Sequence, residues 1–295
     1  MNSFRLGIYC DFLKSMTKSI SDSEKLFLED GVDQGIRNDG RDLTDFRPIV
    51  IALDVISTAN GSSRIRNDEL DIIVAVKVSF LNNLFFFIIA LILFSSNIMD
   101  KISNVAPSFT EEDYSFYITN IVKDMCFKNF DLSKLTILEN KLYWNIYIDA
   151  TILSFGGNMV DWVTIAIHTA LRTTRIPKIH VSPSISTKEN NKDVSYTVSP
   201  SVCSGTPFPF QDIPFIISAG CIRGKVIWDM NMQEQICSKT IIALSINSKG
   251  ECVAMNKVYS NTLDLNLIPT IINKAAEISS EISKSLDEFF SNKQV

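Results

Sequence analysis

The stretch YIDATILSFGGNMVDWVTIAIHTALRTTRIP, residues 147–177, decides the fold of this chain. Its first part alternates aromatic and β-branched residues with polar ones, which predicts a strand that ends near Phe155. Gly156 and Gly157 follow, and the apolar run that begins at Met159 predicts a helix. We therefore expect a fold that combines strands and helices around this strand, turn and helix.

The segments before this stretch predict a helix, a charged turn and a pair of strands. Ser21 or Ser23 can cap a short helix, because acids follow in its first turn. The expected elements are a helix in 19–37, a turn in 38–48, strands in 48–57 and 71–80 around a turn at 60–63, and a helix in 110–130.

The segments after it predict a second half of similar composition. Strands are expected at 214–221 and 225–230 around Arg223–Gly224, then a helix or turn at 231–239, and a hairpin at 240–258. Apolar residues at helical spacing predict a last helix in 265–290. The fold class is therefore α+β, with an extension at 1–20, a first half at 21–180, a polar loop at 181–207 and a second half at 208–295.

The composition is that of an ordinary globular protein, with 46% hydrophobic and 21% charged residues. A net charge of −5 argues against binding of nucleic acid by bulk electrostatics, so RNA contact would need a local basic patch. The six cysteines are scattered and the two histidines are too few for a zinc cluster, so we expect no metal or cofactor and free thiols in a reducing compartment. Residues 1–18 lack the long apolar core of a secretory signal.

The uncharged run from Val78 to Met99 is long enough for a membrane-spanning helix. Asn82 and Asn83 interrupt it, however, and leave the apolar core LFFFIIALILF at 84–94. Two interpretations compete with a membrane span: a strand at 87–94 buried on both faces, or translated AT-rich non-coding sequence. We expect no membrane association. The coding status of residues 1–15 is open in the same way, because Met16 could be the true start.

Three segments resemble the RNase PH-like ring subunits of the RNA exosome. They are DGRDLTDFR at 39–47, the strand, paired glycines and helix at 147–177, and DIPFIIS at 212–218 with the strands that follow. The combination of DGR, D-[FY]-R and G-G-N-x-x-D is specific to this family, and the likeness extends over about residues 20–290. It implies an RNase PH-like fold of two βαβ-type halves with mixed sheets and helices.

The resemblance also implies partners and a cellular place. A six-membered ring of RNase PH-like subunits would surround an RNA channel, together with cap subunits and a separate catalytic nuclease. The chain would then act in 3′–5′ RNA processing and degradation, including that of ribosomal RNA, in the nucleus, nucleolus and cytoplasm.

The same resemblance predicts that this chain is not an enzyme. Active members place Thr-Arg after the paired glycines, where a helix N-terminus and a guanidinium hold phosphate, but here Asn158 and Met159 stand there. Active members also carry two aspartates six residues apart, and here Asp212 is matched with Thr206. We therefore expect no catalytic residues. The alternative is a phosphorolytic 3′–5′ exoribonuclease whose site is completed at a subunit interface.

Several motif residues admit a structural and a functional interpretation. The segment with Asp39, Gly40, Arg41, Asp45 and Arg47 could contact RNA, but a tight turn whose arginines pair with neighbouring carboxylates is favoured. For Gly156 and Gly157 we expect a strand-to-helix turn with close packing. Asp161 is expected to be a first-turn acid at the helix N-terminus, and His168 a core or interface residue.

Basic residues on both sides of the central helix are the candidates for RNA contact. On a strand, alternate residues share a face, so Arg64 and Arg66 would point the same way. The RNA-binding candidates are Arg64, Arg66, Arg172, Arg175 and Lys178. A solvated surface is the competing interpretation of each.

Overall fold

The computed structural model describes residues 20–81, 88–94, 111–138, 142–183, 194–198, 205–257 and 264–293. The first half contains α2 (Asp22–Asp33), β1 (Val50–Leu53), β2 (Gly61–Arg66), β3 (Asp71–Leu81), β4 (Ile88–Phe94), α4 (Glu111–Val122), β5 (Thr136–Leu138), β6 (Leu142–Ser154) and α5 (Met159–Thr173). The remainder contains β7 (Arg175–Ile176), β8 (Ile179–Pro183), β9 (Val194–Val198), β10 (Thr206–Pro207), β11 (Phe215–Ile222), β12 (Lys225–Trp228), α6 (Met232–Cys237), β13 (Thr240–Ile246), β14 (Cys252–Lys257) and α7 (Leu267–Lys293).

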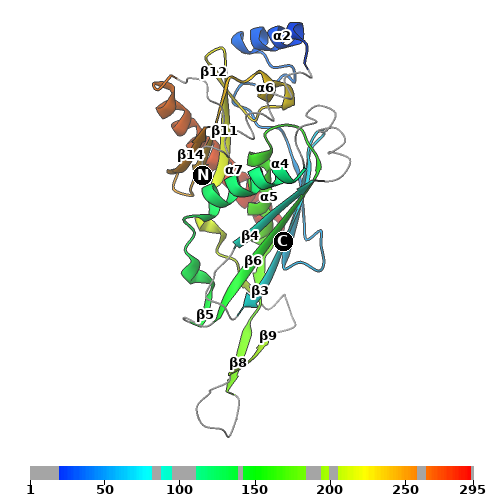
Figure 1. Ribbon diagram of the computed structural model, residues 1–295, viewed down its shortest axis with the longest axis vertical. Coiled ribbons are helices and arrows are strands. Elements are labelled where there is room, and N and C mark those ends of the chain that lie inside the picture. Colours follow the sequence, from blue (N-terminus) through cyan, green and yellow to red (C-terminus); the bar gives the residue numbers. More distant parts are fainter. Residues whose placement is uncertain are drawn as a thin grey trace.

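The molecule contains two main sheets (Figure 1), and β7 with β10 and β8 with β9 form two further two-stranded sheets. The first has the order β1-β2-β3-β6-β4, and its pairs are antiparallel except for β4 and β6, which are parallel and joined through α4. The second has the order β12-β11-β13-β14 and is antiparallel throughout. Since β12 and β13 both run antiparallel to β11, the connection through α6 is a split βαβ unit. The expected α+β architecture of two βαβ-type halves is confirmed.

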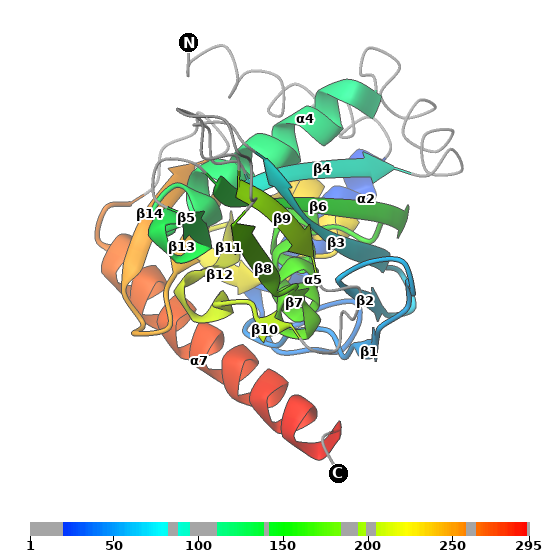
Figure 2. The same cartoon turned by 90° about the horizontal axis from the view of Figure 1, so that it is seen from below.

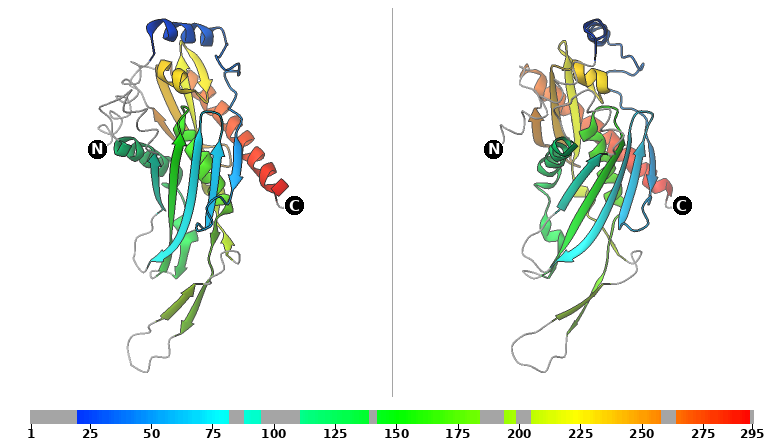
Figure 3. Two further views of the ribbon diagram at one scale, coloured as in Figure 1. Left: turned by 90° about the vertical axis from the view of Figure 1, so that its right-hand side faces the viewer. Right: turned by 45° about the vertical axis from the view of Figure 1, so that its right-hand side comes forward.

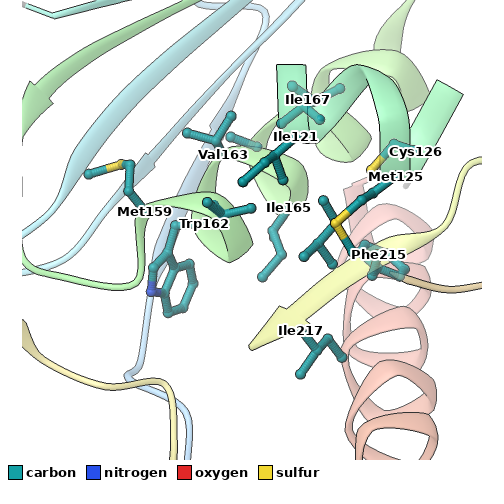
Figure 4. Packing of buried hydrophobic residues seen from close by; sticks show 14 of the residues in the cluster. Ile121, Met125, Cys126, Met159, Trp162, Val163, Ile165, Ile167, Phe215 and Ile217 are labelled. Carbon is teal, nitrogen blue, oxygen red and sulfur yellow. The ribbon is translucent and has the colours of Figure 1, made fainter. Parts of the chain in front are cut away.

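Helix α5 lies between the two sheets and forms the centre of the core. Every residue from Met159 to Leu171 is buried, which explains why the helix is apolar on all sides. It contacts β2 and β3 of the first sheet and β11 of the second. Figure 4 shows its side chains meeting Ile121 and Met125 of the α4 region and Phe215 and Ile217 of β11.

Strand β6 supplies the long axis of the first sheet. Its residues Ile146, Ile148, Ala150 and Ile152 are buried, while the residues between them are mostly part-exposed, as expected for a strand with one face on the core. Helix α7 lies along one side of the molecule, and its C-terminal part extends past the sheets (Figure 2). Helix α2 packs at one end of the molecule against α6 (Figure 3).

Two segments, one expected to be a turn and the other a polar loop, contain strands. Gly61, Ser62 and Ser63, expected in a turn, belong to β2, because the turn lies earlier and Gly61 pairs with Val76. The expected polar loop at 181–207 includes the end of β8 and all of β9, which form an antiparallel hairpin. The ladder places His180 opposite Thr197 and Val181 opposite Tyr196.

The apolar run contributes a strand. Ile88–Phe94 forms β4 and pairs in parallel with β6 from Ile146 to Ile152, as the strand interpretation predicted. The burial of its side chains lies outside the described residues, as do residues 95–110 and 1–19. Among the helices of the described segments, none has the length and apolar character to cross a bilayer.

The strand-to-helix turn depends on Gly157, which has a φ of +84°. A Cβ at this position would lie 2.6 Å from the backbone of Asn231 and Met232, at the start of α6. The glycine therefore lets the first half approach the backbone of the second.

We expect Gly157→Ala to lower the free energy of unfolding by about 2 kcal/mol or more, through the left-handed backbone and the backbone clash together. Gly35→Ala is the matched control, because Gly35 has a φ of +79° but no atom within 4 Å of an added Cβ. The control should lose about 1 kcal/mol, the cost of the backbone conformation alone. Urea unfolding measures both losses, and equal losses would contradict the close approach at Gly157.

Candidate functional site

The most polar part of the core is a buried carboxylate, Asp229, just after β12. Its side chain is fully buried and accepts hydrogen bonds from two arginines of the 38–48 turn. Arg47 donates through Nε at 3.0 Å, Nη2 at 2.8 Å and its backbone N–H at 2.8 Å, and Arg41 donates through Nη1 at 3.0 Å. Trp162 Nε1 of α5 donates at 2.9 Å. We call Asp229, Arg41, Arg47 and Trp162 the Asp229 centre.

The pairing keeps the Asp229 carboxylate ionised. Burial alone would raise the pKa of Asp229, but the hydrogen bonds and charge of Arg47, with the charge of Arg41, hold the pKa below its usual value. Asp229 in turn raises the pKa of the Arg47 guanidinium, although burial lowers it. The Asp229 centre is thus a charge-paired structure with its hydrogen bonds satisfied.

A second buried ion pair joins the same two parts of the chain. Arg37, at the end of the N-terminal segment, binds Glu234 of α6 through two hydrogen bonds of 2.8 and 2.7 Å. Arg37 also donates to the carbonyl oxygens of Trp228 and Asp229. Glu234 completes a capping box with Asn231, which starts α6.

The DGR segment has a structural role, but its arginines also bind a partner that the sequence did not indicate. Arg41 does pair with neighbouring Asp39, at 2.6 Å. The principal partner of both Arg41 and Arg47, however, is Asp229, more than 180 residues away. The expected pair with a neighbouring carboxylate is therefore present, and the sequence did not indicate the more distant partner, Asp229.

Protein groups bind the turn at Gly156 and Gly157 from two sides, from Arg47 and from α6, and we call it the sealed glycine turn. Arg47 Nη1 donates to the Gly156 carbonyl at 2.6 Å, and Arg47 Nη2 donates to the Gly157 carbonyl at 3.3 Å. The backbone N–H of Asn158 donates to Gln235 Oε1 of α6 at 3.1 Å. Asn158 and Met159 are buried, at 3% and 1% exposure. The place where active relatives would hold phosphate is therefore filled by protein groups.

Asp161 links α5 to the second sheet. Its carboxylate accepts from the Ser218 backbone N–H at 2.6 Å, from Ser218 Oγ at 2.5 Å and from Asn158 Nδ2 at 2.9 Å. Asp161 is fully buried, and burial raises its pKa to about 7, although the hydrogen bonds from Ser218 and Asn158 lower it. Asp161 is the first-turn acid that the sequence predicted, and it also ties α5 to β11.

A cavity of about 740 Å³ adjoins the Asp229 centre, between the 41–51 segment and α7. Much of its wall is apolar, formed by side chains such as Phe46, Ile49, Ile278 and Leu286. The arginines at its edge, Arg41 and Arg47, already bind Asp229. The cavity is therefore ill suited to hold phosphate.

The expected acid pair does not lie at the glycine turn. The Ile213 carbonyl, next to Asp212, binds His168 Nε2 at 3.0 Å, and Thr206 pairs with Ile176 after the end of α5. His168 lies about 14 Å along α5 from Met159, at a rise of about 1.5 Å per residue. Thr206 and Asp212 thus flank the far half of α5, and the alignment that made them the acid pair was wrong. The Asp212 side chain lies outside the described residues.

His168 is a core residue, as predicted. It is 4% exposed and its ring stacks on Phe215 at 4.1 Å between centroids. Burial and then the charge of Arg172 lower its pKa to about 3, so the imidazole is neutral.

The structure separates the five basic candidates for RNA contact. Arg64 and Arg66 do share the outer face of β2, where Arg66 is exposed and Arg64 binds Asp71 through bonds of 2.9 and 2.6 Å. Arg175 and Lys178 are exposed near the start of β2, since the Arg175 backbone N–H donates to the Asn60 carbonyl.

Arg172 stands apart from this group. Its side chain is 5% exposed, binds Asp287 of α7 at 2.5 Å, and packs against the rings of Phe210 and Phe290. Its guanidinium is therefore already engaged within the fold, which differs from the exposed patch that the sequence suggested.

Sequence reasoning missed the residues of the second half that hold this region. They are Ser218, Asp229, Glu234 and Gln235. A partial signal existed, because Asn231 and Glu234 have the spacing of a capping box. No local pattern indicates that Asp229 would meet arginines from the other end of the chain.

Asp161 gives a pH-dependent prediction. Because its folded pKa of about 7 exceeds the ordinary value of 3.8, the folded state favours the protonated acid, and stability falls as pH rises from about 4 to about 7. Asp161→Asn mimics the protonated acid and should remove this slope, which is at most about 1.4 kcal/mol per pH unit.

The measurement is the difference in unfolding free energy between wild type and Asp161→Asn at each pH. The difference cancels the opposite slope expected from His168, whose pKa is lowered to about 3. Asp161→Ala is the control for lost hydrogen bonds and should be destabilised at every pH. A difference that does not change between pH 4 and 7 would contradict the raised pKa.

Comparisons with known proteins agree with this fold. Residues 45–177 match the RNase PH model, described as the 3′ exoribonuclease family, domain 1. A Dictyostelium discoideum protein, provisionally named exosome complex exonuclease RRP42, is 23% identical over 92% of this chain and 98% of its own length. The exosome complex component Rrp42 of Methanothermobacter thermautotrophicus is 25% identical over 93% of this chain and 94% of its own.

Solved structures show the same fold. The archaeal exosome core superposes with a TM-score of 0.67 at 18% identity, covering 90% of this chain and 97% of the other. The Archaeoglobus fulgidus exosome with RNA bound to its active site gives a TM-score of 0.69 at 18% identity, covering 90% and 98%. The paired glycines and the DGR segment thus lie in a chain whose residues 45–177 match the RNase PH family model and which is similar to exosome Rrp42 components over most of its length.

Proposed function

We propose that this chain is a non-catalytic structural subunit of an exosome ring that helps to guide RNA toward 3′–5′ processing and degradation. The observation that carries the proposal is the sealed glycine turn. Phosphorolysis needs an inorganic phosphate held by backbone N–H groups and a cationic side chain. Here the Asn158 N–H binds Gln235, and the nearby Arg47 binds Asp229.

The described acids of the second half that lie next to this turn are both paired with arginines, Asp229 with Arg47 and Glu234 with Arg37. The residue that faces the turn from α6 is Gln235, a neutral amide. Six residues later stands Ile241, a β13 residue that is 3% exposed. Neither side chain can transfer a proton or hold a metal ion as a carboxylate does.

The assembly part of the proposal is supported by the relatives, which are named exosome components and match almost the whole chain. The partners would be other RNase PH-like subunits, with cap subunits and a separate nuclease. Nuclear, nucleolar and cytoplasmic location belongs to the proposal as well. The residues proposed to contact RNA are Arg64, Arg66, Arg175 and Lys178. Arg172 is left out because its guanidinium binds Asp287 of α7.

The competing function is a phosphorolytic 3′–5′ exoribonuclease. The name of the Dictyostelium relative includes the word exonuclease, and a site could be completed at an interface between subunits. Such a site would need the glycine turn to open, which breaks the contacts of Asn158 and Gln235.

One experiment tests both parts. The purified chain, alone and mixed with the RNase PH-like proteins of its own organism, is incubated with end-labelled RNA and inorganic phosphate. The chain alone should leave the RNA intact and release no nucleoside diphosphate, and native mass spectrometry of the mixture should show it in a ring. Phosphate-dependent shortening by the chain alone, or its recovery as a free monomer from the mixture, would overturn the proposal.

The assembled ring also tests the RNA contacts. Changing Arg66 and Arg175 to Glu should weaken crosslinking of single-stranded RNA several-fold and flatten its dependence on salt, because each lost phosphate contact reduces counterion release. Lys225→Glu is the control, since Lys225 is an exposed base on β12 of the second sheet. An equal effect of both changes would count against a local RNA patch.

A further inference from the structure

Helix α2 exposes large apolar side chains at one end of the molecule (Figure 1). Leu26 is 53% exposed and Phe27 67%, and Ile36, three residues after the helix, is 63% exposed. The inward face is already used, because Leu28 and Val32 are buried against the second half. In the part of the chain that the structure describes, these outward apolar side chains remain more than half exposed, and such clusters mark interaction sites.

The surroundings of these residues are acidic. Helix α2 carries five carboxylates, Asp22, Glu24, Glu29, Asp30 and Asp33, and one base, the part-exposed Lys25. Glu29 and Asp30 bind Arg223 of the β11–β12 turn. The exposed Asp22 and Asp33 lie four and seven residues from Leu26, so they share its helical face.

This charge restricts what can cover Leu26 and Phe27. RNA and an anionic membrane surface would both be repelled by the carboxylates. A second copy of this chain packed by two-fold symmetry would bring the same acids together. A protein surface with an apolar pocket rimmed by lysine or arginine satisfies both the apolar and the charged groups.

We propose that the α2 surface, defined as Leu26, Phe27, Ile36, Asp22 and Asp33, binds a different protein through an apolar pocket with a basic rim. Phe27 is the anchor, because aromatic residues dominate the binding energy of such contacts. Asp22 and Asp33 face the rim and select the partner by charge. The α2 surface lies apart from the glycine turn, so this inference does not depend on the proposed function.

The first test places a photocrosslinking residue, p-benzoylphenylalanine, at Phe27 of the full chain in its own cells. The control is the same residue at Phe116, which is 53% exposed on α4. Position 27 should give a crosslink to one protein that position 116 does not give, and the crosslinked peptide should contain lysine or arginine. Crosslinks to RNA, to lipid, to a second copy or to residues 1–19 of the same chain would overturn the proposal, as would no crosslink.

The second test measures binding of the protein identified in this way. Phe27→Ser and Asp33→Lys should each weaken its affinity at least tenfold and leave the unfolding midpoint of the chain unchanged, because both side chains are exposed. Reversing the crosslinked basic residue of the partner to Glu should restore binding to Asp33→Lys. Affinity that is insensitive to Asp33→Lys, or a partner reversal that restores nothing, would overturn the basic rim.

The two proposals fail separately. A chain that does not join a ring but keeps the Phe27 crosslink loses the proposed function alone. A chain that joins the ring with Phe27→Ser and gives no crosslink at position 27 loses the α2 surface alone.

Discussion

The hydrogen bonds of the buried Asp229 carboxylate are the interaction on which the rest of the structure depends. Asp229 lies after β12 in the second sheet, yet its partners Arg41 and Arg47 come from the segment before the first sheet, and Trp162 comes from the helix between the sheets. Removing the carboxylate would take the shared counter-charge from two guanidinium groups and leave them only the more exposed Asp39 and Glu69, which costs more than losing an exposed pair. The N-terminal segment, the central helix and the second sheet are therefore held in one arrangement.

The same contacts use the polar groups at the turn between β6 and α5. Arg47 binds the carbonyl groups of Gly156 and Gly157 as well as Asp229, so the guanidinium at this turn is used for structure. Gln235 uses the Asn158 N–H that begins the helix. Asp161, which would repel an anion, binds Ser218 instead and ties α5 to β11. The turn between β6 and α5 is therefore a junction between the two halves of the fold.

The local sequence pattern was enough to predict the helices and strands and to find the family resemblance. The alternation of β6, the all-round apolar α5 and the strands of the second half followed from the periodicity of their residues. The sequence did not predict which residues pair when they are far apart along the chain. The carboxylate partner of Arg41 and Arg47 is distant in sequence, and Asp212 was assigned to the glycine turn from spacing although it lies beside the other half of α5. Spacing along the chain carries no information on which end of a helix a later loop will reach. The weak β8–β9 hairpin was missed because its residues lack a core-facing pattern.

The most direct test of the account is a double-mutant cycle between Arg47 and Asp229, read from urea unfolding of the full chain. Asp229→Asn and Arg47→Gln should each lower the free energy of unfolding by about 3 kcal/mol or more, because each leaves a buried charge without its partner. The double variant should lose much less than the sum, with a coupling of about 2 kcal/mol. Losses that simply add, or single losses below about 1 kcal/mol, would show that the Asp229 centre does not hold the two halves together.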